Sequence, residues 1–459
     1  MAEHSVTVEN TLQTLLTDKK YSTIRDILVT MNPADIAAVF AGVESDKLPL
    51  LFRLLPKELA AESFVEMESE EQESLIKGIS DKELRQVMDE LYVDDAVDIV
   101  EEMPANVVQR ILAQADPEMR KEINEILQYP EDSAGSVMTT EYVKLTPDMT
   151  VGDAILRIRR TGVDKETIYT CYVLQNRLLV GTVSVKSLLL APSDLQTIDS
   201  IMESNLITVT THTDQEEVAR MMSKYNLLAI PVVDGDNRMV GIVTFDDAMD
   251  VVEEETTEDM EIMAGMTPSD KTYLRSSPID LFLHRIPWLS LLMISATFTG
   301  MIISGFEKAL ASMTCLAAFI PMLMDTGGNS GSQSSVTVIR ALSLGELEFS
   351  DLGKVIWKEI RTAMICGACL SVLCFAKVML VDRLIMGNDE VSIMVAVVVG
   401  LTLAVTVLCA KLVGCTLPML AKKLGFDPAV MASPFITTIV DALSLLVYFG
   451  IATSLLKIA

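Results

Sequence analysis

Residues 428–456 read PAVMASPFITTIVDALSLLVYFGIATSLL, a run of 29 residues in which Asp441 carries the only charge. A helix of about 20 apolar residues is long enough to cross the roughly 30 Å hydrocarbon core of a bilayer. Four further runs hold at most one charge each, and they cover residues 287–306, 309–339, 362–381 and 391–410. We therefore expect residues 281–459 to form an all-α transmembrane domain of five helices.

Charge is divided along the chain as unevenly as hydrophobicity. Of the 64 acidic and 36 basic residues, 11 acids and 12 bases lie after residue 280, which leaves the first 280 residues with a net charge of −29. Such an acidic surface argues against nucleic-acid binding, because phosphate contacts need a basic one. The start, MAEHSVTVEN, shows no basic and apolar leader, so we expect this part to stay in the cytosol.

The basic residues of the predicted membrane loops give the orientation. Six Lys and Arg residues lie in the loops on the N-terminal side, and three lie on the opposite side. Because Lys and Arg collect in cytoplasmic loops, we expect a multi-pass protein of the cell membrane with a cytoplasmic N-terminus and an outer C-terminus.

Polar residues inside two of the predicted spans indicate more than an anchor. A carboxylate in hydrocarbon costs several kcal/mol, so Asp441 should face a cavity, an ion path or a partner helix. Residues 321–333, PMLMDTGGNSGSQ, predict a broken helix whose unwound carbonyls suit a hard cation. A kink that lets helices pack closely is the alternative. The pore-lining candidates are Asp325, Gly327, Gly328, Asn329, Gly331, Gln333, Thr437 and Thr438.

Proline-containing dipeptides divide the first part of the chain into short amphipathic segments. They include Asn32-Pro33, Leu55-Pro56 and Met103-Pro104. The stretches DIAAVF, from Asp35, and ELAAESF, from Glu58, echo each other 23 residues apart. We expect an acidic, all-α helical-repeat N domain over residues 1–130.

A second repeat follows over residues 131–250. The motif SVMT from Ser136 returns as SIME from Ser200, and LVGTVS from Leu179 returns as MVGIVT from Met239. Each copy, about 134–198 and 199–250, runs from a polar turn into an amphipathic helix and then β-rich segments, and resembles a tandem pair of CBS domains, an α/β module. Such modules often bind adenine nucleotides through [ST]xxD, which copy two matches at Thr244 and Asp247. Copy one has Ser187 in place of the aspartate.

Two acidic clusters stand out beside these domains. The stretch from Asp246 to Asp259, DDAMDVVEEETTED, leads into a connecting helix that we place at residues 251–280. Asp94, Asp95 and Asp98 form the other cluster. Like charges one turn apart destabilise a helix, so each cluster is either a solvated face or a place where divalent cations bind. Asp427, before Pro428, either offsets a helix dipole or contacts metal.

The order of these parts resembles the MgtE family of magnesium channels and transporters over almost the whole chain. The most specific matches are GGNSGSQ at 327–333, RIPW at 285–288 and SPFITTIVD at 433–441. The resemblance implies a homodimer with a pore on its two-fold axis, where Asp441 from each chain binds hydrated Mg²⁺. It also implies that the connector, a plug helix, closes the pore when Mg²⁺ joins the cytosolic domains. Candidate sensor ligands are Asp94, Asp95, Asp98, Asp247, Asp250, Glu255, Glu258, Asp259 and Asp427.

Other interpretations remain open at this stage. The chain departs from the family at Asn226, where a ligating aspartate is expected, so one sensor site is weaker or differently built. The transported ion is Mg²⁺ or another divalent such as Co²⁺ or Ni²⁺, and ATP is a candidate ligand of the CBS module. A membrane-anchored nucleotide sensor is the main alternative to transport. Asp325-Thr326-Gly327 matches the DTG of aspartic proteases, but it lies in a predicted helical hairpin, so we expect no enzyme.

Overall fold

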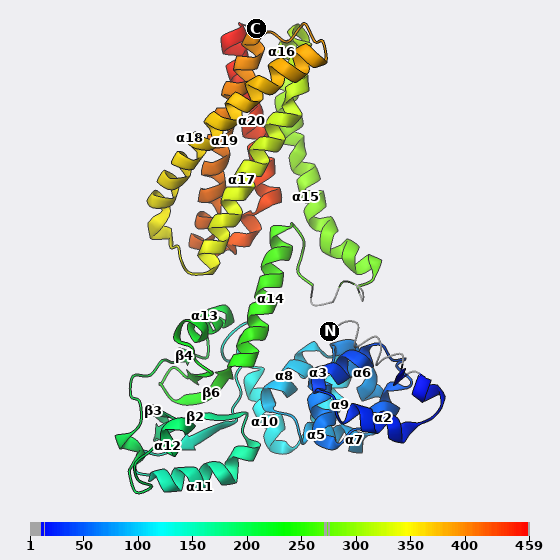
Figure 1. The fold of residues 1–459 in the computed structure, drawn as a ribbon, viewed down its shortest axis with the longest axis vertical. Helices are drawn as coiled ribbons and strands as arrows, with labels where there is room; N and C mark the ends of the chain where they lie inside the picture. Colours follow the sequence, from blue (N-terminus) through cyan, green and yellow to red (C-terminus); the bar gives the residue numbers. More distant parts are fainter. Residues whose placement is uncertain (1–10, 13, 270–272, 274–275, 458–459) are drawn as a thin grey trace. The chain divides into compact units, whose positions relative to one another are not determined.

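The computed structural model describes residues 11–12, 14–269, 273 and 276–457. They form two compact units, the first ending at Val252 and the second starting at Glu253 (Figure 1). Residues 1–10, on which the expectation of a missing leader rests, lie outside the described residues, as do residue 13, part of the predicted connector (270–272 and 274–275) and residues 458–459.

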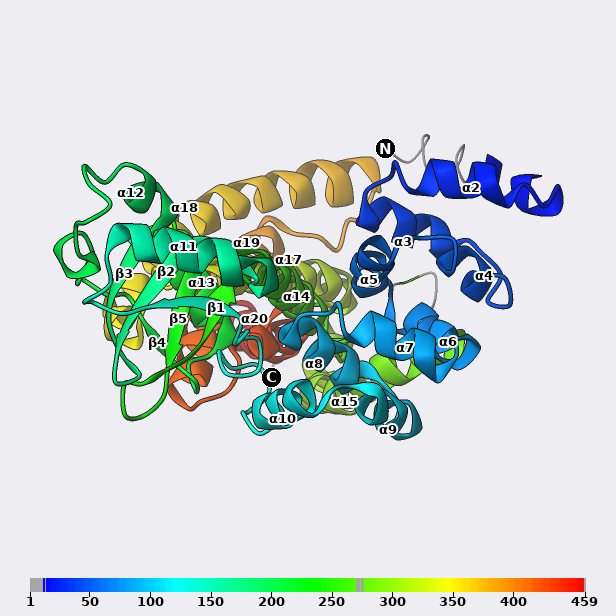
Figure 2. The same ribbon diagram turned by 90° about the horizontal axis from the view of Figure 1, so that it is seen from below.

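Short helices form the N-terminal part of the first unit, and polar residues start several of them. Asn32, Ser80 and Asp116 each accept a hydrogen bond from a backbone N–H of the helix that follows, which stabilises its first turn. Helix α3 packs on α5, α5 on α7 and α7 on α9 (Figure 2), so the all-α helical-repeat N domain is confirmed. The helices are α2 (Tyr21–Leu28), α3 (Pro33–Ala41), α4 (Leu48–Phe52), α5 (Lys57–Val65), α6 (Ser69–Gly78), α7 (Asp81–Met88), α8 (Val93–Glu102), α9 (Ala105–Gln114) and α10 (Pro117–Ile126).

Two three-stranded sheets follow, one in each copy of the second repeat. In both sheets the first strand pairs parallel to the second, and the second pairs antiparallel to the third. The predicted α/β CBS module is therefore confirmed. The first copy contains β1 (Tyr142–Leu145), α11 (Val151–Thr161), β2 (Thr167–Gln175), β3 (Leu178–Ser184) and α12 (Val185–Leu189). The second contains β4 (Val209–Thr210), α13 (Gln215–Tyr225), β5 (Ala229–Val233) and β6 (Met239–Thr244).

Helix α14 (Phe245–Met263) begins directly after β6. It starts in the first unit and ends in the second, so the acidic stretch predicted as part of a connector is helical. Beyond the helix, residues 266–269 have no regular structure, and the backbone N–H of Thr267 donates to the carbonyl oxygen of His284 at 2.9 Å. Regular structure resumes at α15 (Pro278–Gly305), whose first turn is closed by a capping box between Ser277 and Asp280.

Among the described residues, four helical stretches have the length and apolarity of a membrane span. They are Pro278–Gly305, Phe349–Ile385, Ile393–Lys423 and Pro428–Leu456, and they contain α15, α18 (Leu352–Lys377), α19 (Ile393–Lys423) and α20 (Ser433–Leu456). The sequence predicts five spans. The remaining one corresponds to α17 (Ile320–Ser343), which at 24 residues is long enough but carries many polar and small residues. It is shielded by packing against α19 and α20.

The predicted break in this helix is wrong, because α17 continues without interruption through Gly327, Gly328 and Gly331. A Cβ atom at Gly327 would lie 2.7 Å from the Thr406 side chain, and one at Gly331 would lie 3.2 Å from the Ala410 carbonyl oxygen. These glycines therefore let α19 and α20 approach α17 closely, which was the alternative interpretation. Their carbonyls stay in the helix and are not free to bind a cation.

Candidate functional site

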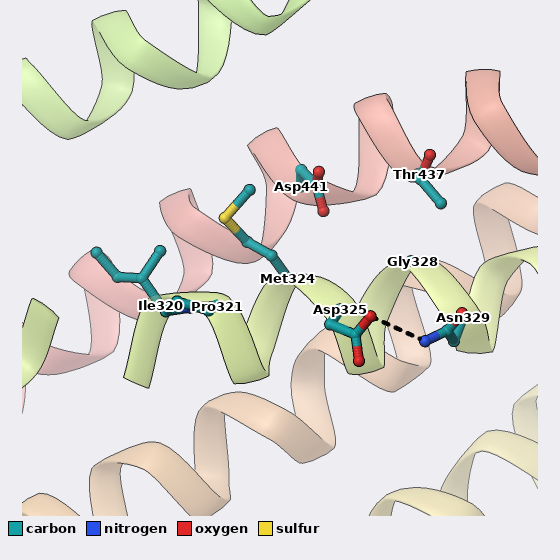
Figure 3. Close-up of a pocket in the computed structure, with 8 residues that line it drawn as sticks. All are labelled: Ile320, Pro321, Met324, Asp325, Gly328, Asn329, Thr437 and Asp441. Atoms are coloured by element: carbon teal, nitrogen blue, oxygen red, sulfur yellow. Dashed lines mark hydrogen bonds between the residues drawn. The ribbon is translucent and has the colours of Figure 1, made fainter. Parts of the chain in front are cut away.

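A pocket of about 440 Å³ lies between α17 and α20 in the second unit. Figure 3 shows Asp325 of α17 and Asp441 of α20 on its two sides. Asp441 lies more than two turns inside α20, and Asp325 lies in the second turn of α17, in a bundle of membrane-spanning length. The pocket is lined by Ile320, Pro321, Met324, Asp325, Gly328, Asn329, Thr437 and Asp441.

An amide and a hydroxyl lie beside the pocket carboxylates, and the amide orients one of them. The Asn329 side-chain amide donates to Oδ1 of Asp325 at 3.2 Å, one turn along the same helix (Figure 3). Thr437 lies one turn before Asp441, and its hydroxyl donates to the Pro434 carbonyl at 2.9 Å. The walls therefore offer carboxylate, amide and hydroxyl oxygens, which are the ligands of hard cations and of their hydration water. The structure thus places Asp325 beside Asp441, which the sequence left open.

The other pore-lining candidates lie outside this pocket. Gly327 and Gly331 are buried against neighbouring helices, and Gln333 is exposed elsewhere on α17. The Thr438 hydroxyl donates to the Pro434 carbonyl at 3.1 Å and does not line the pocket. Of the predicted set, Asp325, Gly328, Asn329, Thr437 and Asp441 come together.

Several predicted sensor residues meet at a second place, in the first unit. Helix α8 buries Val93, Ala96, Val97 and Val100 in the core of the N domain, so its aspartates lie on the neighbouring faces. Asp94 is only 6% exposed, whereas Asp98 is exposed. Asp247, in the first turn of α14, is the charge that acts most strongly on all three aspartates of α8. We call Asp94, Asp95, Asp98 and Asp247 the acidic cluster.

Crowding of like charges away from water dominates the electrostatics of this cluster. Burial and the charge of Asp247 raise the pKa of Asp94, and the same two causes raise the pKa of Asp95 to about 7. Partial desolvation and Asp247 raise the pKa of Asp98 to about 8. Burial and Asp246 raise the pKa of Asp247 to about 6, against the hydrogen bonds that it accepts from Thr244. A divalent cation would relieve this repulsion.

Two glutamates that the sequence analysis missed belong beside the acidic cluster. Burial and the charge of Asp95 raise the pKa of Glu166 to about 8. Burial raises the pKa of Glu141 to about 7, although Lys165 opposes the shift. Each is a single acid before a strand, so no local pattern marks it; only the pairing of β1 with β2 brings the two together. Within the described part of the chain, no three acidic, His or Cys side chains lie close enough together to hold a metal ion.

The remaining sensor candidates are spread along α14 and near α20. Asp250 lies close enough to Asp247 to raise its pKa, and Glu255 and Glu258 follow on the same helix. Burial and the charge of Asp427 raise the pKa of Asp259, so these two acids of the second unit do come together. Asp427 also accepts a hydrogen bond from the Ala429 N–H at 2.7 Å. It caps a short 3-10 turn, Pro428–Met431, rather than α20 itself, which begins at Ser433.

The predicted nucleotide residues form a local hydrogen-bonded unit. The Thr244 hydroxyl donates to Oδ2 of Asp247 at 2.5 Å, and the Thr244 backbone N–H donates to the same oxygen at 3.3 Å. In copy one, Ser184 accepts from the Ser187 N–H at 3.0 Å, where no carboxylate is available. Asp247 therefore belongs both to the nucleotide motif and to the acidic cluster.

Comparison with known families assigns the N domain, the CBS pair and residues 320–451 of the membrane bundle. The MgtE family, described as a divalent cation transporter, matches residues 320–451, and the MgtE intracellular N domain matches residues 31–132. The CBS domain family matches residues 134–194 and 198–254.

Characterised relatives match along nearly the whole chain. The magnesium transporter MgtE of Thermus thermophilus is 36% identical over 451 residues, 97% of this chain and 98% of that protein. The magnesium transporter MgtE of Bacillus subtilis is 33% identical, over 96% of this chain and 95% of that protein. Among solved structures, the crystal structure of the cytosolic domain of the Mg²⁺ channel MgtE in complex with ATP has 36% sequence identity to this chain. It covers 53% of this chain and 99% of its own, with a TM-score of 0.51.

Proposed function

Because this chain belongs to the MgtE family of divalent cation transporters, we propose that it carries Mg²⁺ across a cell membrane through the pocket of Asp325 and Asp441. The observation that carries the proposal is the presence of two carboxylates on facing helices of a membrane-spanning bundle. Charged groups at this depth are costly and usually mark an ion pathway. The family also argues against the protease interpretation of Asp325-Thr326-Gly327.

The pocket suits a hydrated divalent ion. Mg²⁺ dehydrates reluctantly and prefers an octahedral shell of oxygen ligands. Six waters take up roughly 180 Å³, and the pocket offers about 440 Å³. The carboxylates of Asp325 and Asp441 can therefore attract the ion and accept hydrogen bonds from its water. Binding through water is weak enough for the ion to leave, as conduction requires.

Mg²⁺ uptake into proteoliposomes tests this function directly. We expect uptake by the wild-type chain, and its loss in Asp441→Ala, while Glu346→Gln, an exposed loop acid, behaves as wild type. Co²⁺ or Ni²⁺ uptake that exceeds Mg²⁺ uptake in the same vesicles would transfer the proposal to that ion. Absence of any cation uptake, with nucleotide binding retained, would favour the membrane-anchored nucleotide sensor.

We also infer that the acidic cluster senses Mg²⁺ and closes the pathway. The raised pKa values of Asp95, Asp98 and Asp247 support this inference, because without the ion these carboxylates repel one another and weaken the contact of α8 with the CBS module. Bound Mg²⁺ would pull α8 toward α14, the helix that leads into the second unit. Asp250, Glu255 and Glu258 extend this sensing surface along α14, and Asp259 with Asp427 forms its counterpart in the second unit.

The assembly and orientation belong to the same proposal. The family resemblance supports a homodimer in which each chain supplies one Asp441, to be tested by light scattering in detergent. The first unit faces the cytoplasm and the C-terminus lies outside, as the basic residues of the loops indicate. Protease digestion of intact inside-out vesicles should therefore remove the first unit. Protection of the first unit there would reverse the orientation.

ATP binding at the CBS module is supported by the ATP complex of the related cytosolic domain. We propose the site at Thr244 and Asp247, since copy one lacks the aspartate. Because Asp247 also belongs to the acidic cluster, ATP and Mg²⁺ should change each other's affinity. Calorimetric titration of the full chain with ATP, with and without Mg²⁺, measures this coupling, and independent binding would separate the two sites.

A further inference from the structure

A buried pair of opposite charges lies between α17, α18 and α19 in the second unit. Glu359 of α18 and Lys411 of α19 keep only 15% and 7% of their side chains exposed, and their charged atoms lie 3.8 Å apart. The Ser334 hydroxyl of α17 donates to Oε2 of Glu359 at 2.6 Å and accepts a hydrogen bond from Nζ of Lys411 at 3.3 Å. These side chains therefore form one network that joins the three helices.

Stability alone does not account for charges at this place. Charged side chains inside a membrane bundle are costly, and a well-packed apolar pair of similar size is often at least as stable as a buried ion pair. What the pair contributes is direction, because hydrogen bonds to charged groups are strong and have a defined geometry. The Ser334 hydroxyl lies between an ammonium donor and a carboxylate acceptor, so its proton points to Glu359 and its lone pair to Lys411.

The network holds the helix that forms one wall of the pocket. Ser334 follows Asp325 by nine residues on α17. That spacing is about two and a half helical turns, so the two side chains leave the helix on opposite sides. Figure 3 shows Asp325 on α17 beside the helix that carries Asp441. Because α17 is unbroken between Asp325 and Ser334, a rotation or shift at Ser334 also moves Asp325 relative to Asp441.

Hydrogen bonds on the other side of α17 attach the same turns to the start of the last helix. The hydroxyls of Ser332 and Ser433 share a hydrogen bond at 2.9 Å, and the Ser335 hydroxyl donates to the Met431 carbonyl at 2.8 Å. These bonds hold α17 on the side of α20, whereas the charge pair holds it on the side of α18 and α19. The position of α17 is therefore set from both sides at this level of the bundle.

We propose that Glu359 and Lys411 are positioning residues for the ion pathway, and that they act through Ser334 to keep Asp325 opposite Asp441. This inference rests on the proposed function of the pocket, and it adds residues of α18 and α19 that do not line the pocket. Loss of the network lets α17 shift, so the two pocket carboxylates attract Mg²⁺ less well. The Mg²⁺ concentration at half-maximal uptake then rises, while the pathway itself remains.

Mg²⁺ uptake into proteoliposomes, measured over a range of Mg²⁺ concentrations, tests the positioning role. Ser334→Ala removes the hydroxyl that both charges share, and it should raise the half-saturating Mg²⁺ concentration several-fold. The matched control is Ser371→Ala, which removes the 2.7 Å hydrogen bond from Ser371 of α18 to the Gly400 carbonyl of α19 and leaves α17 untouched. It should lower the melting temperature but keep the wild-type half-saturating concentration. Equal half-saturating concentrations in the two variants would overturn the proposal.

Variants of the charges separate positioning from the burial of a charge. Lys411→Met should lose most uptake, because it leaves Glu359 as a buried charge without its cation. Glu359→Gln/Lys411→Met removes both charges, and the new amide oxygen can still accept from Ser334. This double variant should recover uptake, with a half-saturating concentration between those of wild type and Ser334→Ala. A double variant as inactive as Lys411→Met would indicate that the charges act on the ion itself, and it would overturn the proposal.

Asp441→Ala in the same vesicles separates this inference from the proposed function. If Asp441→Ala abolishes uptake while Ser334→Ala leaves the half-saturating Mg²⁺ concentration unchanged, only the positioning role fails. If Asp441→Ala takes up Mg²⁺ as wild type does, the pocket is not the pathway, and both the proposed function of the pocket and the positioning role fail.

Discussion

The pocket in the second unit and the acidic cluster in the first unit both use carboxylates, but in opposite ways. The pocket has two, Asp325 and Asp441, on separate helices, and the Asn329 side-chain amide donates a hydrogen bond to Asp325. The cluster crowds Asp94, Asp95, Asp98 and Asp247 together, with Glu141 and Glu166 beside them. Few and solvated carboxylates can bind a hydrated ion weakly and release it. Many crowded carboxylates repel one another, so on our proposal the contacts between them tighten when a cation binds.

If our proposal holds, this difference lets one ion have two effects in one chain, passage through the pocket and closure through the acidic cluster. Weak contact through water is needed for passage, whereas a sensor must gain free energy when the ion arrives. The repulsion in the acidic cluster supplies that gain, because each bound cation removes a penalty that already exists. Changes in one region should therefore leave the behaviour of the other intact.

The largest expected effect comes from removing both pocket charges. Asp325→Asn/Asp441→Asn should lose nearly all Mg²⁺ uptake into proteoliposomes, because the pathway no longer attracts a divalent cation. The same variant should retain the Mg²⁺-dependent rise in the melting temperature of the first unit. Loss of that rise would show that the two regions are not separate.

Mg²⁺ uptake should be nearly as sensitive to a change in the close helix packing behind the pocket. A Cβ atom at Gly414 of α19 would lie on the carbonyl oxygen of Gly331, so Gly414→Ala must push α17 away from α19. We expect a cost of about 1–3 kcal/mol in bundle stability and a large drop in Mg²⁺ uptake. Gly353→Ala in α18 is the matched control, since nothing lies within 4 Å of its added Cβ, and uptake should persist. Equal uptake by both variants would contradict the close packing.

The two glutamates beside the acidic cluster predict an unusual pH dependence of stability. Glu141 and Glu166 have pKa values raised to about 7 and about 8, so the folded unit binds more protons than the unfolded chain between about pH 4 and pH 8. The free energy of unfolding should therefore fall as pH rises through this window, on the order of a few kcal/mol. Calorimetry of the full chain in EDTA measures it. Stability that rises over the same window would contradict the crowding of these acids, and saturating Mg²⁺ should flatten the curve.

The smallest effect concerns the orientation of Asp325. Asn329→Ala removes the 3.2 Å hydrogen bond to its carboxylate and should reduce uptake about fivefold, as expected for a bond of about 1 kcal/mol. Gln333→Ala, one turn further along α17, is the control because its exposed side chain does not line the pocket. A larger effect at Gln333 than at Asn329 would move the pathway away from the pocket.

Local sequence patterns predicted a large share of this structure. A lone charge in an apolar run singled out Asp441, which lines the pocket, and the repeat predicted a helix followed by strands, as α13, β5 and β6 show. The glycines of α17 were misinterpreted because unwound backbone and close helix packing use the same small residues. Only the positions of Thr406 and Ala410 on α19 decide between them. Glu141 and Glu166 were missed because sheet pairing, not sequence proximity, brings them together.

The most direct test of the account is the Mg²⁺ dose–response of uptake by a chain whose α8 acids are neutral. Asp94→Asn/Asp95→Asn/Asp98→Asn should conduct Mg²⁺ as wild type does but no longer be inhibited when Mg²⁺ rises on the side of the first unit. Asp26→Asn/Asp89→Asn/Glu90→Gln, which changes three exposed acids of the N domain, should keep normal inhibition. An unchanged dose–response in the Asp94, Asp95 and Asp98 variant would contradict the claim that one region passes the ion while the other senses it.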